Sequence, residues 1–169
     1  MTLADLNELS PEQARQVLSS CCGVTRWLDA MVASRPYQSL DHILATAKAA
    51  SLRLKADDWR EAFARHAGER AGGLDAAWSV AEQSIAAHSS EATRKALAEV
   101  NQLYEQRFGH IFLTCATGKS GDEILGEARA RLLNEPAREL MVAADEQRKI
   151  MRLRLRKLLG TTGPGQARA

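Results

Sequence analysis

The chain has 169 residues, of which 45% are hydrophobic, and its 23 basic and 21 acidic side chains give a formal net charge of +2. This length and composition predict one domain with a hydrophobic core, and the charge balance gives no case for binding nucleic acid or a membrane surface. Three cysteines, two of them adjacent, make a poor disulfide framework, and no apolar run is long enough to predict a transmembrane helix. Because the N-terminus also lacks signal-peptide features, we expect a cytoplasmic protein.

Four helices are predicted in the first part of the chain. Ser10-Pro11 is typical of a helix start, with a capping serine and a proline at the first helical position. The fourth helix carries three ring-bearing side chains spaced i, i+4, i+7, which therefore share one face: Trp59, Phe63 and His66. The predicted starts are Ser10, Val24, Ser39 and Asp57.

Four more helices are predicted after a glycine-rich loop at Gly68, Gly72 and Gly73. The expected ranges are 74–87, Ser89 or Ser90 to Phe108, Ser120 to about Leu133, and Asn134 to Gly160. No alternation of strands and helices is visible. The sequence therefore predicts an all-α fold, a single-domain compact bundle of about eight helices over residues 1–160. Residues 161–169 are polar and are predicted to be a disordered tail.

The stretch from Ile111 to Ala116 is the least helical part of this pattern. Gly109 is predicted to end the preceding helix, and Ser120, with Glu123 three residues later, to cap the next one. Between them lies a run too short for a helix and too apolar for a solvated loop, so we expect it to be buried. Buried backbone N–H and C=O groups need partners, and a bound small molecule could supply some of them.

Arg154 is a charged residue on the apolar face of the last predicted helix, and Gln147 lies on the same face. An arginine that faces a core needs a carboxylate or an anionic ligand as partner. The apolar positions of this face are Leu140, Ala143, Ala144, Ile150, Met151, Leu155 and Leu158.

His66, Glu82 and Arg154 are hypothesised to converge on one cavity. Histidine can transfer protons near neutral pH, arginine can bind an anion through two hydrogen bonds, and a carboxylate can orient either the histidine or a substrate hydroxyl. The same pattern also fits a structural histidine, a solvated Glu82, or a structural ion pair between Arg154 and an acid such as Glu82.

Several other site types lack support in the sequence. Gly118-Lys119-Ser120 imitates a phosphate-binding loop, but Leu113 stands where the first glycine of that motif belongs. The four histidines are scattered, and neither an HExxH nor a CxxC motif is present, so no metal site is predicted. The absence of GxSxG gives no indication of a serine hydrolase.

Three motifs in the chain resemble those of the OHCU decarboxylase family. They are SVAEQ at residues 79–83, N-x-x-Y-x-x-x-FG at 101–109 followed by FLTCA at 112–116, and KIMRLRL at 149–155. OHCU is 2-oxo-4-hydroxy-4-carboxy-5-ureidoimidazoline, an intermediate between urate and allantoin. The resemblance extends over almost the whole chain and implies decarboxylation of OHCU to (S)-allantoin without a metal or other cofactor.

The resemblance also implies a site and a quaternary structure. It implies that His66 is catalytic, that Glu82 and Arg154 share its pocket, and that the protein is a homodimer acting on a small molecule. The implied substrate-binding residues are Ala67, Ser79, Val80, Ala81, Gln83, Phe112, Leu113, Thr114, Cys115 and Ala116.

One motif departs from the family pattern. The family usually has HPxIG at the histidine, whereas this chain has HAGER at residues 66–70. Proline would stiffen the backbone beside the histidine, and Ala67 and Gly68 do not. The alternatives are a helical ligand-binding protein that has lost catalysis, and a protein acting on a related ureido or imidazoline acid.

Overall fold

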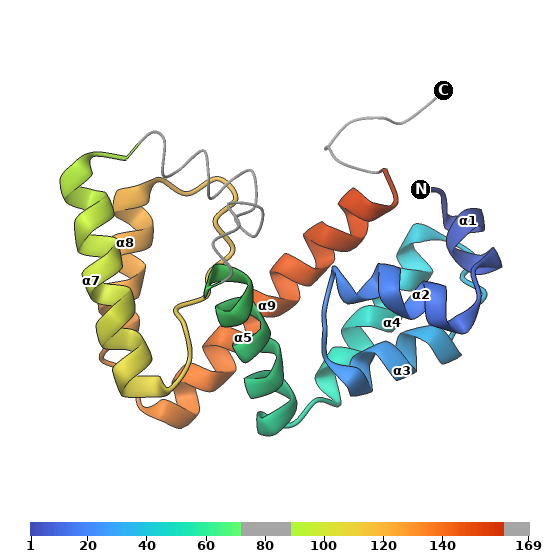
Figure 1. Ribbon diagram of the computed structural model, residues 1–169, viewed down its shortest axis with the longest axis horizontal. Coiled ribbons are helices and arrows are strands. Elements are labelled where there is room, and N and C mark those ends of the chain that lie inside the picture. Colours follow the sequence, from blue (N-terminus) through green and yellow to red (C-terminus); the bar gives the residue numbers. More distant parts are fainter. Residues whose placement is uncertain (72–88, 161–169) are drawn as a thin grey trace. The chain divides into compact units, whose positions relative to one another are not determined.

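The computed structural model describes residues 1–71 and 89–160, and for residues 65–71 it describes only the backbone. These described residues form eight helices and no strand, which confirms the predicted all-α class (Figure 1). The helices are α1 (Leu3–Glu8), α2 (Pro11–Ser19), α3 (Thr25–Ala33), α4 (Leu40–Leu52), α5 (Ala56–Ala71), α7 (Glu91–Phe108), α8 (Gly121–Arg131) and α9 (Pro136–Leu158).

Capping side chains set most of the helix starts. Ser10, Ser39, Ser90 and Ser120 each accept a hydrogen bond from a backbone N–H in the first turn of the helix that follows, as the sequence predicts. Helix α1, which the sequence pattern did not predict, begins with the same device, because Thr2 and Asp5 form a reciprocal capping box.

The chain divides into two compact units. The first unit comprises Met1–Asp58 together with the chain from Arg148 onward. In it α2 packs on α3 and α3 on α4, around buried side chains such as Trp27 and Ile43. The indole N–H of Trp27 donates to the carbonyl of Ala47 at 3.2 Å, so the polar group of this buried ring has a hydrogen-bond partner.

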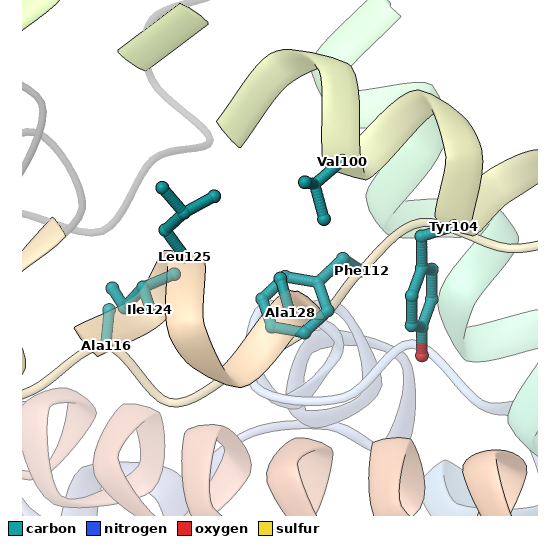
Figure 2. Close-up of a cluster of buried hydrophobic side chains, with 7 residues drawn as sticks. All are labelled: Val100, Tyr104, Phe112, Ala116, Ile124, Leu125 and Ala128. Atoms are coloured by element: carbon teal, nitrogen blue, oxygen red, sulfur yellow. The ribbon is translucent and has the colours of Figure 1, made fainter. Parts of the chain in front are cut away.

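The second unit is Trp59–Gln147, and it contains the connection between α7 and α8. Helices α7 and α8 lie side by side. A core cluster of buried side chains fills the space between them and the connecting segment (Figure 2). The cluster consists of Val100, Tyr104, Phe112, Ala116, Ile124, Leu125 and Ala128.

Two sequence predictions concern residues 68–87. The loop predicted to begin at Gly68 is wrong at that position, because α5 continues to Ala71. A single glycine costs an α-helix only about 1 kcal/mol, so it need not end one. The predicted helix 74–87 and the predicted tail 161–169 lie outside the described residues, and the domain boundaries stay a prediction. No helix in the described ranges has the length and hydropathy needed to cross a membrane.

Candidate functional site

The segment Ile111–Ala116 connects α7 to α8 and has neither helical nor strand structure. Gly109 ends α7 with a φ of 73°, the left-handed conformation that glycine adopts without steric cost. Ile111, Phe112, Leu113, Thr114 and Ala116 are buried, and Cys115 is half-buried. The prediction of a buried, non-helical stretch at this position is therefore confirmed.

Side chains from three helices bind the backbone of this segment. The amide N–H of Phe112 donates to Oδ1 of Asn101 on α7 at 3.0 Å. The carbonyl oxygen of Leu113 accepts from Nη1 of Arg131 on α8 at 2.9 Å. The amide N–H of Cys115 donates to Oε2 of Glu146 on α9 at 2.8 Å. The protein itself therefore supplies the hydrogen-bond partners of these three groups. From the sequence alone, a bound small molecule was also a possible partner.

Arg131 is buried at the end of α8 and pairs with Glu139 of α9, whose side chain has no exposed surface. Its Nε and Nη2 donate to Oε1 of Glu139 at 2.8 and 2.6 Å, and the hydroxyl of Tyr104 donates to the same oxygen. Burial lowers the pKa of Arg131, but the hydrogen bonds to Glu139 and Glu127 and the nearby charges of Glu139 and Tyr104 together outweigh that effect, and the pKa is raised. Burial and the bond to Glu139 also raise the pKa of Tyr104, which therefore stays a donor.

Thr114 lies within hydrogen-bonding distance of three charged side chains. Its hydroxyl oxygen is 2.8 Å from Nζ of Lys119, 3.1 Å from Oε1 of Glu127 and 3.3 Å from Oε2 of Glu146. Lys119 also pairs with Glu127, at 2.5 Å between Nζ and Oε2. The lysine of the apparent phosphate-binding motif is thus the partner of a carboxylate of the protein.

His110 precedes the segment and is packed among aromatic rings. Its ring centroid lies 4.8 Å from that of Phe63 and 5.4 Å from that of Tyr104. Burial lowers its pKa from the ordinary value of 6.5, so the ring is neutral at neutral pH. Its Nδ1 lies 3.1 Å from the carbonyl oxygen of Ile111, and because this oxygen can only accept, the arrangement places the proton on Nδ1.

The catalytic residues predicted from the sequence are only partly described. His66 and Ala67 lie in the backbone of α5, and their side chains are outside the described residues. Arg154 belongs to the first unit, is half-buried, and donates from Nη1 to the carbonyl of Ser20 at 3.1 Å. The convergence of these side chains on one cavity stays a prediction. The predicted residues beyond the described ranges are Ser79, Val80, Ala81, Glu82 and Gln83.

Sequence reasoning missed the buried carboxylates of α9, although it placed the apolar face of this helix correctly around Ala143 and Gln147. Glu139 and Glu146 are buried on the same helix, four residues before and three residues after Ala143. That spacing puts both glutamates on the same helix face on which the sequence analysis placed Arg154. The signal was present in the helical spacing, but the expectation that a glutamate on a helix is solvated hid it.

The described residues thus form an all-helical fold. In it, polar side chains of α7, α8 and α9 bind the backbone of the apolar segment between α7 and α8. Residues 7–156 match the family model described as OHCU decarboxylase. The chain belongs to this family.

Two curated relatives share parts of the sequence. The uric acid degradation bifunctional protein TTL of Arabidopsis thaliana is 37% identical over 147 residues, which are 82% of this chain and 45% of the plant protein. The 2-oxo-4-hydroxy-4-carboxy-5-ureidoimidazoline decarboxylase of Amia calva is 42% identical over 60 residues, which are 36% of this chain and 34% of that protein. The chain thus spans less than half the length of each of these relatives.

Two solved structures share the fold. The crystal structure of an OHCU decarboxylase in the presence of (S)-allantoin superposes with a TM-score of 0.73 at 29% identity, covering 90% of this chain and 99% of that one. The crystal structure of an (S)-allantoin synthase gives a TM-score of 0.67 at 17% identity, covering 94% of this chain and 54% of that one. At this lower identity the second likeness concerns the fold alone.

Proposed function

We propose that this chain catalyses the cofactor-independent decarboxylation of OHCU to (S)-allantoin. The observation that carries the proposal is the family match over residues 7–156. A second support is the likeness to nearly the whole length of an OHCU decarboxylase that was crystallised in the presence of (S)-allantoin. The substrate is accordingly a small organic anion, and the motif resemblance further supports a homodimer.

The chemistry needs few groups from the protein. In OHCU the carbon that bears the carboxylate also bears a hydroxyl and lies next to a C=N bond. When the bond to the carboxylate breaks, CO2 leaves and the electron pair moves into the C=N system. The ring nitrogen then takes up a proton, a second proton is delivered to one face of the carbon that bears the ureido group and sets the handedness of the product, and the hydroxyl loses its proton to become a carbonyl. No external electron sink is required, and the protein has to hold the anion and deliver the proton.

Three residues are assigned to these tasks by the motif resemblance. His66 acts as the general acid, because a neutral or protonated imidazole can exchange a proton near pH 7. Glu82 binds the hydroxyl or ureido group. Arg154 binds the anionic or carbonyl oxygens and stabilises charge as it shifts. The half-buried position of Arg154 on α9 is compatible with this role, because within the described residues its hydrogen bond to the carbonyl of Ser20 uses Nη1 alone and leaves other N–H donors of the guanidinium for a ligand.

A coupled assay tests the proposal. OHCU is generated freshly from urate by the two upstream enzymes, this protein is added, and circular dichroism follows allantoin as it forms. We expect one enantiomer to appear faster than the slow racemic background. A His66→Asn variant should lose this acceleration, and His42→Asn serves as a histidine control on another helix. Folded wild-type protein without acceleration contradicts the proposal.

A second candidate is a family member with altered chemistry, and the HAGER sequence favours it. Helix α5 runs through residues 66–68 without interruption to Ala71. A proline at position 67 would remove an N–H from the helix interior, so the family's HPxIG pattern implies a different local backbone. Such a protein would bind a ureido or imidazoline acid without decarboxylating OHCU. Calorimetric binding of (S)-allantoin in the absence of turnover would support it.

A further inference from the structure

Glu146 of α9 is a buried carboxylate that binds the backbone of the α7–α8 segment. The residue is 6% exposed. Oε2 accepts from the amide N–H of Cys115 at 2.8 Å and lies 3.3 Å from the hydroxyl oxygen of Thr114. These two contacts hold the Thr114–Cys115 peptide in place.

Arg131 fixes the other side of the same residue. It donates to the carbonyl of Leu113 at 2.9 Å, so the peptide groups before and after Thr114 are both held by charged side chains. Thr114 is itself only 7% exposed, so charged side chains hold a buried residue of the segment from both sides.

A buried carboxylate has a high desolvation cost, and the hydrogen bonds of Glu146 to Cys115 and Thr114 help to offset it. Glu146 follows Ala143 and Ala144 on the buried face of α9, where an apolar side chain would suit the helix pattern. The carboxylate supplies an acceptor for the Cys115 amide and the Thr114 hydroxyl, which an apolar side chain does not.

We propose that Glu146 is a positioning residue of the proposed decarboxylase. It does not touch the substrate. It acts through the backbone of Thr114 and Cys115, which it holds where the segment 112–116 contacts the substrate. The inference rests on the proposed function, in which this segment lines the substrate site.

The test compares Glu146→Leu, Glu146→Gln and the wild type, with Glu99→Gln, an exposed carboxylate on α7, as control. Leucine fills the space but accepts no hydrogen bond, and we expect a higher KM and a drop of about 100-fold in kcat/KM, as for a substrate misplaced by about 1 Å. Glutamine keeps an acceptor oxygen and should restore most of the activity. Glu99→Gln should match the wild type.

Two results overturn the inference. One is a folded Glu146→Leu protein with wild-type KM and kcat/KM. The other is a loss of kcat equal to the unfolded fraction with KM unchanged, which indicates a structural role alone. Hydrogen exchange at the Cys115 amide, measured without substrate, should be slow in the wild type and the glutamine variant and fast in the leucine variant. If the wild type shows no turnover, the proposed function fails, and this exchange rate alone decides whether Glu146 holds the segment.

Discussion

Arg131 and Glu139 form an ion pair inside the second unit, 2.6 Å apart and eight residues apart in sequence, where neither side chain is exposed enough to be hydrated. The pair joins the end of α8 to the first turn of α9, and the carboxylate of Glu139 also accepts a hydrogen bond from the hydroxyl of Tyr104. Through its Nη1 the same arginine reaches the carbonyl of Leu113. Arg131 thus connects the turn between α8 and α9 with the segment Ile111–Ala116, which is the candidate substrate segment.

The first prediction concerns this pair. Arg131→Met leaves the carboxylate of Glu139 buried without its cation, and we expect the free energy of unfolding to fall by about 3–5 kcal/mol. The double variant Arg131→Met, Glu139→Met should lose less than the sum of the two single variants. Urea unfolding followed by circular dichroism measures these values. Arg129→Met, exposed on the same helix, is the control and should change stability by less than about 0.5 kcal/mol. Additive single effects would contradict a coupled buried pair.

The second prediction concerns pH. Burial lowers the pKa of His110 in the folded state below its ordinary value of 6.5. The unfolded chain therefore binds a proton at this site more readily, and the stability contributed by the neutral ring is present above pH 6.5 and is lost as the pH falls below it. We expect the midpoint of thermal unfolding to decrease from pH 7 to pH 5, and to decrease less in His110→Phe. An NMR titration that gives His110 a pKa above 6.5 would contradict the prediction.

The third prediction is a pair of substitutions of opposite sign on α8. A Cβ at Gly121 would lie 2.1 Å from the Oγ of Ser89, 3.1 Å from its Cβ and 3.3 Å from Cγ2 of Thr93, so Gly121→Ala should destabilise the protein. A Cβ at Gly126 meets nothing within 4 Å, and Gly126→Ala should stabilise the helix by about 0.5–1 kcal/mol. Thermal unfolding of both variants checks the signs. Equal effects of the two alanines would show that the N-terminus of α8 is not packed as described.

The fourth prediction concerns catalysis. Loss of the general acid in His66→Asn should lower kcat by about 10²–10⁴-fold while the far-ultraviolet circular dichroism stays unchanged. Arg154→Lys keeps the charge but loses planar, two-point anion binding, so its main effect should be a higher KM. Both are measured in the coupled assay. Near-full turnover by His66→Asn would remove the acid role from this residue.

Local signals in the sequence predicted much of the fold. Ser10, Ser90 and Ser120 mark helix starts through capping chemistry that depends on a few neighbouring residues, and Gly109 marks a helix end for the same reason. The predicted loop at Gly68 was wrong because a glycine can also lie inside a helix, and α5 continues past it.

The polar network was harder to predict. Glu139 and Glu146 are buried only because partners on other elements satisfy them, and the sequence does not state those pairings. Arg154, which the same reasoning did select, has a backbone carbonyl as its described partner. The convergence of Arg154 with His66 and Glu82 stays a prediction, because the latter two side chains lie outside the described residues.

The segment between α7 and α8 has a consequence for the order of folding. Its backbone contacts come from Asn101, Arg131 and Glu146, which are as far as 31 residues away in sequence. It has no helical or strand pairing of its own that could form early, so it can become ordered only after three helices have come together. Substitutions at these contacts should therefore speed unfolding while leaving the folding rate nearly unchanged. The segment Ile111–Ala116 would then be the last part of the second unit to form and the first to open.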